Sequence, residues 1–386
     1  MSKIERKLLF SEGEYQQRSD RIRRVMEERG LDVLLLHSLP TLHYVTGFQT
    51  IALRAYSCFV MGVEGDGTIV VERDEQYNVQ QNSWVEAIAT YARWDDPIQI
   101  TADVVNRRAR RAKRIGVELG SRYLSPLQFS QLSAALATAE IVDATDIVPD
   151  RMLLKSVSEL DYIAQASAIT VRGIHAALDA VAVGKTDNDI AALAFAALVG
   201  NGSEYMSSDP IVCVGQNASI PHGHFKNRKV KAGDTILLEM SACVGRYSGP
   251  LMRAVSIGKP NPTVMAMASA CRDAVESLIA SMKPGALFAD TAVKGKTALA
   301  RAGSGMIFHG TYAYSTGTGF PGVSWADCPL EVRDGGTRIF EPGMVFHLPM
   351  SLRYEGEYGV AVSETVAITE HGCTVLTDMS RELFIR

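Results

Sequence analysis

Over residues 1–152, hydrophobic and polar positions follow helical and strand-like periods in turn. Residues 12–29 place Ile22, Val25 and Met26 on one side and charged residues on the other, and Gly30 follows. This arrangement predicts an amphipathic helix that ends at the glycine. Short apolar runs that are typical of buried strands occur at 31–37, 58–62, 68–72, 115–118 and 140–143. We therefore predict an α/β domain over residues 1–152.

Residues 153–386 contain longer amphipathic segments separated by apolar strands. Either Ser156 or Ser158 caps the first of these helices, and either Thr186 or Asp187 caps the second. The helices are predicted at 159–182, 186–200, 264–282 and 288–302. The strands are predicted at 211–214, 235–240, 344–348 and 360–368. Paired helices that alternate with antiparallel strands predict an α+β domain with the helices on one face of a sheet.

Glu239 lies near the end of the apolar strand predicted at 235–240. A carboxylate in this position loses hydration, so it must be paired, bind a ligand or take part in chemistry. For a lone glutamate, a solvated strand end is the more frequent explanation. Asp234 lies in the turn that leads into this strand, and His222 comes twelve positions before it. His222 is a second candidate for the same site.

Composition and charge are those of an ordinary globular enzyme. Hydrophobic residues make up 47% of the 386 positions, charged residues make up 21%, and the net charge is −4. This balance provides no basic surface for nucleic acid or for an acidic membrane. The basic run at 107–114 is interleaved with alanine, so we interpret it as the solvated face of a helix. We expect neither nucleic acid nor a membrane as a partner.

Other features of the chain point to a reducing compartment. The six cysteines are scattered, without the close pairs of a zinc site or the density of a disulfide scaffold. The first residues lack the apolar core of a signal peptide, and no segment approaches roughly eighteen uninterrupted apolar residues. We expect a cytoplasmic protein.

Six segments then carry a family resemblance. In order, they are LLKSVSEL, GQNASIPHGH, KAGDTILLE with GRYSGPLMRA, TGTGF, EPGMVFHLP and GVAVSETVAITEHG. This series resembles the pita-bread family of creatinases, methionine aminopeptidases and prolidases. The resemblance implies a C-terminal pita-bread domain at 153–386, a smaller creatinase/prolidase-type domain at 1–152, and a homodimer.

The resemblance also implies the loss of a metal site. The peptidases of the family hold two metal ions with two Asp, one His and two Glu. At the corresponding positions, this chain has Glu239, Pro250, Thr316, Pro349 and Glu364. Proline offers no side-chain donor, and a hydroxyl is a poor substitute for an imidazole. Two carboxylates out of five ligands argue against a metallopeptidase, so we expect no metal and no other cofactor.

His347 lies next to the lost ligand position at Pro349. It is a candidate replacement ligand or substrate contact. A lone histidine in an apolar strand is, however, more often a packed, hydrogen-bonded residue.

The chain is most similar to the metal-independent branch that contains ectoine hydrolase. In that branch the Glu matching Glu239 is the proposed nucleophile on the ring amidine carbon. A cyclic amidine is cationic at neutral pH, so the substrate's own charge replaces that of the metals. Glu239 either attacks this carbon or activates water, Glu364 holds a ring N–H, and His222 carries the proton to the leaving nitrogen.

Further residues are candidates for binding a small zwitterionic substrate. Creatinase uses an arginine from the partner subunit's N-terminal domain, and Arg54 is similar to it in position. Tyr205 and Asp209 precede the segment that leads to His222. The loop from Thr316 to Asp327, which contains Trp325, either shapes the pocket or has glycines that serve only the turn.

Three functions remain open. The first is ring-opening hydrolysis of ectoine or hydroxyectoine to N-acetyl-diaminobutyrate. The second is a creatinase-like amidinohydrolase, and the third is a catalytically inactive pita-bread module that binds a ligand.

Overall fold

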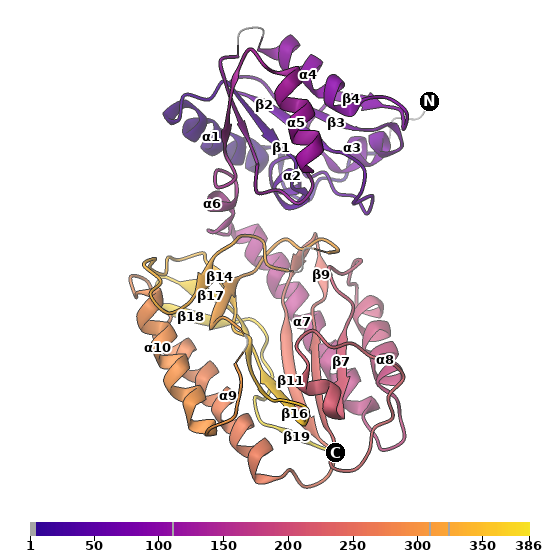
Figure 1. The fold of residues 1–386 in the computed structure, drawn as a ribbon, viewed down its shortest axis with the longest axis vertical. Helices are drawn as coiled ribbons and strands as arrows, with labels where there is room; N and C mark the ends of the chain where they lie inside the picture. Colours follow the sequence, from indigo (N-terminus) through magenta and orange to yellow (C-terminus); the bar gives the residue numbers. More distant parts are fainter. Residues whose placement is uncertain (1–4, 110–111, 309, 323–324) are drawn as a thin grey trace. The chain divides into compact units, whose positions relative to one another are not determined.

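The computed structural model describes residues 5–109, 112–308, 310–322 and 325–386 (Figure 1). The chain divides into two compact units between Met152 and Leu153. Each unit is described separately below.

The first unit is a mixed six-stranded sheet flanked by helices, in the order β4-β3-β2-β1-β5-β6. The central strand β1 (Val33–Leu36) is antiparallel to β2 (Cys58–Gly62) and parallel to β5 (Arg114–Val117). The remaining strands are β3 (Thr68–Glu72), β4 (Ile88–Tyr91) and β6 (Glu140–Asp143). The helices are α1 (Glu12–Glu28), α2 (Leu39–Thr46), α3 (Gln76–Asn82), α4 (Pro97–Arg108), α5 (Pro126–Ala135) and α6 (Pro149–Met152). The predicted α/β class is confirmed.

The basic run at 107–114 does not form one helix face. Helix α4 ends at Arg108 and strand β5 begins at Arg114, so the run spans an element boundary. Positions 110–111 lie outside the described residues. None of the helices in the described ranges is both long and apolar enough to cross a lipid bilayer.

The second unit contains two sheets, each backed by a pair of helices (Figure 1). Strands β7 (Ile211–Val214), β8 (Thr235–Met240), β11 (Leu251–Ser256) and β19 (Phe384–Ile385) form the first sheet, in the order β19-β11-β8-β7. One face of this sheet shares a hydrophobic core with α7 (Val157–Ala180) and α8 (Asp187–Gly200).

The second sheet of this unit has the order β13-β12-β14-β17-β18. Its strands are β12 (Ala313–Ser315), β13 (Glu331–Val332), β14 (Val345–His347), β17 (Thr365–Thr369) and β18 (Gly372–Val375). It shares a core with α9 (Pro262–Ser281) and α10 (Phe288–Leu299). The expectation of helices on one face of a sheet therefore holds for each sheet, but two sheets are present instead of one.

Two short ribbons complete this unit. Strands β15 (Met350–Tyr354) and β16 (Tyr358–Val362) form an antiparallel pair, and β16 packs against β8, β11 and α9. Strands β9 (Cys243–Val244) and β10 (Tyr247–Ser248) form the hairpin that follows β8. The predicted α+β class and the pita-bread architecture are confirmed.

Helix capping decides between the residues that the sequence left open. Ser156 accepts a hydrogen bond from the Glu159 N–H, and the Glu159 carboxylate accepts one from the Ser156 N–H. This reciprocal capping box starts α7 at Val157. Thr186 and Asp189 form the same arrangement at the start of α8.

Candidate functional site

Glu239 lies on the face of the first sheet that is turned away from α7 and α8. It is opposite Ile211 on β7 and Met252 on β11, and directly opposed residues share a face of a sheet. Its neighbour Leu238 points to the other face, into the core with the helices. The face of Glu239 carries a small apolar cluster composed of Ile211, Cys213, Ala218, Leu237, Met252 and Ala361. Because Ala361 belongs to β16, Glu239 faces the β15–β16 ribbon.

The apolar surroundings change the proton affinity of Glu239. Burial raises the pKa of this carboxyl to about 7, and the positive charge of Arg353 offsets part of the increase. A group that titrates near neutrality can both accept and return a proton under physiological conditions. Glu239 is therefore not the solvated strand end that a lone glutamate usually is.

Arg353 reaches this face from β15. It is opposite Gly359 on β16, two residues before Ala361, so it shares the side of the ribbon that carries Ala361. A Cβ atom at Gly359 would lie 1.7 Å from the carbonyl oxygen of Ala218. Glycine at this position therefore lets the ribbon approach the β7–β8 connection closely, next to Glu239.

Tyr314 and His347 form a second polar group on the inner face of the other sheet. They are opposed on β12 and β14, while Phe346 on the alternate face packs into the core with α9 and α10. His347 Nδ1 is 2.7 Å from the Tyr314 hydroxyl, to which the Trp325 Nε1 also donates a hydrogen bond. Burial and then the negative charge of Glu239 raise the pKa of Tyr314 well above its ordinary value. The phenol therefore stays protonated close to Glu239.

His347 is a packed, neutral histidine. Its Nε2 is 2.8 Å from the Ser363 hydroxyl, so both ring nitrogens have hydrogen-bond partners. Burial lowers the pKa of the ring to about 3. Of the two interpretations that the sequence offered, the structure supports the hydrogen-bonded residue and places it behind Tyr314.

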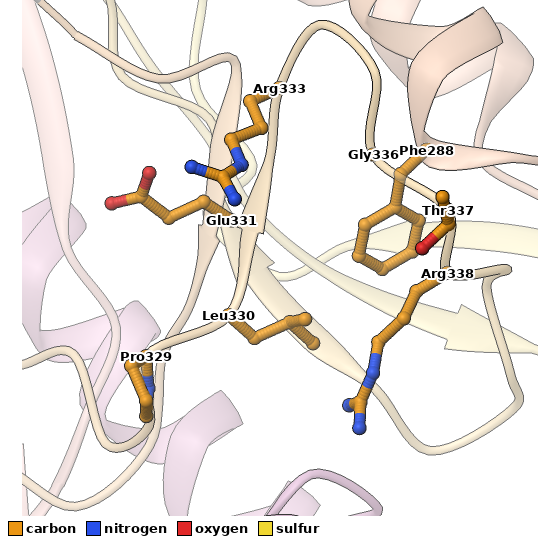
Figure 2. A pocket seen from close by; sticks show the side chains of 8 residues that line it. All are labelled: Phe288, Pro329, Leu330, Glu331, Arg333, Gly336, Thr337 and Arg338. Carbon is orange, nitrogen blue, oxygen red and sulfur yellow. The ribbon is translucent and has the colours of Figure 1, made fainter.

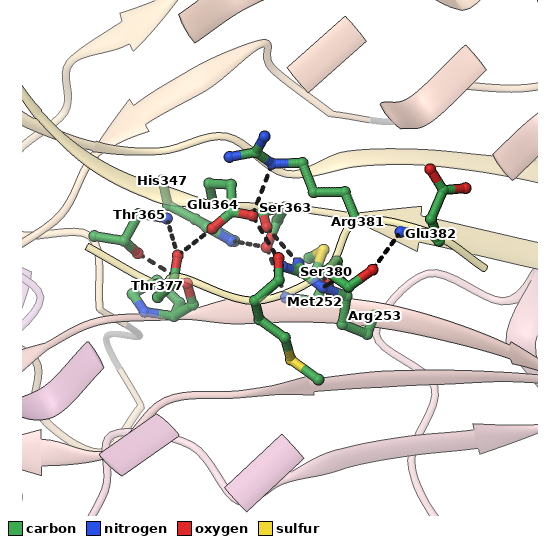
Figure 3. Close-up of polar contacts among 12 residues, drawn as sticks. Met252, Arg253, His347, Ser363, Glu364, Thr365, Thr377, Ser380, Arg381 and Glu382 are labelled. Carbon is green, nitrogen blue, oxygen red and sulfur yellow. Dashed lines mark hydrogen bonds and ion pairs between the residues drawn. The ribbon is translucent and has the colours of Figure 1, made fainter. Parts of the chain in front are cut away.

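Glu364 is held by a group of buried polar partners (Figure 3). Its carboxylate accepts hydrogen bonds from Arg253 at 2.9 Å, from Arg381 at 3.0 Å and from Thr377. Arg253 is opposite Leu238, so it points to the sheet face that Glu239 does not share. The expectation that Glu364 holds the same substrate as Glu239 is corrected: its oxygens bind structural partners.

His222 and Arg54 are both exposed. His222 has a left-handed backbone with φ of 55° in the loop after β7. At the adjacent Gly223, a Cβ atom would lie 3.1 Å from the Cys213 sulfur, so this loop lies against the face that carries Glu239. Arg54 lies in the turn between α2 and β2 of the first unit.

Tyr205 and Asp209 precede β7 and contact other groups. The Tyr205 ring stacks 3.7 Å from the guanidinium of Arg246, at the β9–β10 turn. Asp209 lines a surface pocket of ≈ 450 Å³ beside α8, together with Phe195 and Phe225. Asp209 lies two residues before Ile211, which is opposite Glu239, so the expectation that Tyr205 and Asp209 line the pocket of Glu239 stays a prediction.

The loop after Thr316 is held by structural contacts. Thr316 Oγ1 donates to the Trp325 carbonyl at 2.8 Å, and a Cβ atom at Gly317 would lie 2.1 Å from Asp327. Lys155 and Asp327 form a buried ion pair at 2.6 Å. Gly317 thus serves close packing, while Trp325 supports Tyr314. Positions 323–324 of this loop lie outside the described residues.

A second surface pocket is unrelated to these groups (Figure 2). It has a volume of ≈ 360 Å³ and lies between Phe288, at the start of α10, and the segment around β13. Arg333 and Arg338 line it, with Glu331. None of the residues expected from the sequence to form the site lies there.

The donor atoms of this unit do not fit a dinuclear metal centre. Pro250 and Pro349 have no donor side chain, the Thr316 hydroxyl is bonded to a carbonyl, and Glu364 is bound by arginines. Within the described part of the chain, no three His, Cys, Asp or Glu side chains are arranged to hold a metal ion.

Sequence reasoning missed Tyr314 and Arg353. Tyr314 lies on β12 and Arg353 on β15, both short strands. Their distance from Glu239 on β8 depends on how these strands, which belong to different sheets, pack together. The signal for Arg353 is a basic residue within the alternating apolar pattern of 350–354. Tyr314 has no such signal, since an aromatic residue in a strand is ordinary.

Comparisons with known proteins agree with this architecture. Residues 161–370 match metallopeptidase family M24, and residues 18–152 match the creatinase/prolidase N-terminal domain. The chain is 25% identical to ectoine hydrolase of Halomonas elongata, over 99% of this chain and 100% of that protein. It is 22% identical to an Xaa-Pro dipeptidase of Pyrococcus horikoshii, over 93% and 96%.

Solved structures share the fold along nearly the whole chain. The dipeptidase PepE from Mycobacterium ulcerans matches with a TM-score of 0.84 at 23% identity, over 97% of this chain and 99% of that one. The family match at residues 161–370 spans more than half of the sequence. The chain therefore belongs to metallopeptidase family M24 and carries an N-terminal domain of the creatinase/prolidase type.

Proposed function

We propose that this chain is a metal-independent hydrolase that opens a non-peptide C–N bond in a small zwitterion, with ectoine or hydroxyectoine as the first candidate. The observation that carries the proposal is Glu239, a carboxyl with a pKa raised to about 7 on an apolar face, in a chain whose donor set does not fit two metals. The ectoine hydrolase of Halomonas elongata supports this choice of substrate.

In the proposed reaction, Glu239 acts on water. The carboxylate accepts a proton as the water oxygen bonds to the amidine carbon, and the ring C–N bond then breaks. The proton returns from Glu239 to the leaving nitrogen, which gives the N-acetyl-diaminobutyrate. A pKa near 7 suits both transfers. Direct attack by Glu239 on the amidine carbon would instead break the ring C–N bond, with the leaving nitrogen taking up a proton, and form an O-imidoyl ester of Glu239 that water opens to the amide and the free carboxylate.

Tyr314 would donate a hydrogen bond in this step. Ser363 Oγ accepts a bond from the Met252 N–H at 2.6 Å, so its own proton is available for His347 Nε2. The ring proton then sits on Nδ1 and is donated to the Tyr314 oxygen, which also accepts from Trp325. The Tyr314 proton is left to point toward the substrate beside Glu239.

Other residues have supporting roles in the proposal. His222 lies in the loop against this face and would exchange protons with solvent. Arg54 would enter the site of the partner subunit in a homodimer and add a second positive charge. No cofactor is required.

Two other functions compete with this one. A creatinase-like amidinohydrolase would use the same carboxylate on a guanidino acid, and a binding module would use the site without turnover. Peptidase activity is favoured by the Xaa-Pro dipeptidase relative, but it relies on metals that the donor set here does not fit.

The test is a substrate panel. Purified protein, freed of metal with a chelator, is incubated with ectoine, hydroxyectoine, creatine and a proline dipeptide, and products are identified by mass spectrometry. We expect ring opening of ectoine or hydroxyectoine. Turnover of creatine alone would select the amidinohydrolase, and turnover of the dipeptide after metal addition would select the peptidase.

A further inference from the structure

Arg353 is a buried cation with few partners. Its residue surface is 8% exposed, and its Nε atom has no hydrogen-bond partner among the described residues. Its guanidinium donates one long hydrogen bond, 3.5 Å, to the Leu352 carbonyl, and none of the ion pairs within the described ranges includes it. A buried charge in this condition costs free energy.

Two other buried arginines of this unit make shorter hydrogen bonds than Arg353 does. Arg253 bonds Glu364 and the carbonyls of Met252, Ser363, Met379 and Ser380. Arg246 bonds two carbonyls at 2.7 Å and stacks on an aromatic ring, although its Nε, like that of Arg353, has no hydrogen-bond partner among the described residues. Both arginines thus make short hydrogen bonds to oxygen atoms, whereas the one hydrogen bond of the Arg353 guanidinium within the described residues is 3.5 Å long.

Burial lowers the pKa of Arg353, and Glu239 is the carboxylate whose negative charge raises it. Each of the two groups influences the proton affinity of the other, yet no hydrogen bond or ion pair joins them in the described chain. They are thus two separate, opposite charges on facing apolar surfaces. A ligand that carries both charges would satisfy each of them.

We propose that Arg353 binds the carboxylate of the substrate while Glu239 faces its cationic C–N group. The site would then select small zwitterions whose carboxylate lies a few bonds from the carbon that is hydrolysed. The guanidinium offers two parallel N–H donors to such a carboxylate. This inference rests on the proposed function for its second half, and it assigns the anion site to this chain rather than to Arg54 of a partner.

The anion site is tested without any substrate. Thermal unfolding of the full chain is measured with sodium acetate and with acetamide at matched ionic strength, for wild type, Arg353→Gln, Arg353→Lys and Arg54→Gln. We expect acetate, not acetamide, to raise the Tm of wild type and of Arg54→Gln. The shift is absent in Arg353→Gln and reduced in Arg353→Lys, which keeps the charge but loses the bidentate geometry.

Three results would overturn the assignment. These are no acetate shift in wild type, an equal shift in Arg353→Gln, or a loss confined to Arg54→Gln. If Arg353→Gln does not fold by circular dichroism, the Arg353→Lys comparison decides, because an unchanged shift there contradicts bidentate binding.

A kinetic arm separates this inference from the proposed function. Arg353→Gln is expected to raise KM for ectoine about 10- to 100-fold. The carboxylate-free ring, 2-methyl-tetrahydropyrimidine, is expected to react equally with wild type and variant. Failure of wild type to open any substrate would refute the proposed function, while the acetate result would still decide the role of Arg353.

Discussion

At the residue scale, Glu239 links the stability of the protein to pH. Its pKa rises from 4.5 to about 7 on folding because burial disfavours the charge. Between these values the folded state binds more protons than the unfolded state, so this residue's contribution to stability falls as pH rises and levels off above about 7.

The pH dependence gives the first prediction. Glu239→Gln removes the titration, so its free energy of unfolding should rise relative to wild type between about pH 4.5 and 7.5. Chemical denaturation of both proteins across this range measures the difference. If the free energies of unfolding of the two proteins differ by a constant amount across this pH range, folding does not raise the pKa of Glu239.

Tyr314 gives a second prediction at this scale. Tyr314→Phe removes the hydroxyl beside Glu239 and should lower kcat about 100-fold, as the loss of a positioned hydrogen-bond donor does elsewhere. Trp325→Phe is the matched control, because it removes a donor to the same hydroxyl and leaves the hydroxyl in place. Equal losses of kcat in the two variants would assign the effect to packing.

At the element scale, residues 363–364, between β16 and β17, connect the first sheet of the second unit to the second sheet. Arg253 on β11 bonds Glu364 at this junction, and the Ser363 hydroxyl accepts from the Met252 N–H (Figure 3). Adjacent residues of an extended chain point to opposite sides, so Ser363 faces His347 while Glu364 faces Arg253.

This ion pair gives a third prediction. Glu364→Gln leaves Arg253 buried without its countercharge and should lower the free energy of unfolding by about 3–5 kcal/mol. Glu382→Gln breaks the exposed pair with Arg272 and should cost less than about 1 kcal/mol. We expect kcat per folded molecule to stay near wild type in both. Full stability with lost activity in Glu364→Gln would return that residue to the site.

The same junction shows what sequence could and could not reveal. Hydrophobic periodicity predicted α1, α7, α8, α9 and α10, because long amphipathic segments carry their own signal. It did not predict the shorter helices α2 to α6, and the single strand expected at 360–368 is two strands, β16 and β17. Glu239 could be identified because a charge interrupts an apolar strand. Which of Ser363 and Glu364 faces the site depends on a one-residue register at a strand boundary, and the approach of Tyr314 and Arg353 depends on contacts between separate sheets.

At the scale of the whole molecule, the proposed role of Arg54 requires two chains. A homodimer would have twice the mass of the 41.9 kDa chain, and sedimentation equilibrium measures it. If Arg54 enters the partner's site, mixed dimers of Arg54→Gln and Glu239→Gln each contain one intact site. Refolding an equal mixture should then restore about a quarter of wild-type activity by random pairing. No restoration would place Arg54 outside the partner's site.

Hydrolysis by Glu239 without metal is the central claim, and one measurement tests it most directly. Ectoine turnover is followed by mass spectrometry in ¹⁸O-water, with wild type and Glu239→Gln whose metal content has been brought to zero by chelation and checked by elemental analysis. We predict that metal-free wild type forms N-acetyl-diaminobutyrate with one ¹⁸O at the same rate as the protein before chelation. Folded Glu239→Gln is predicted to form none. Turnover that appears only after metal is added back, or that persists in Glu239→Gln, would contradict the account.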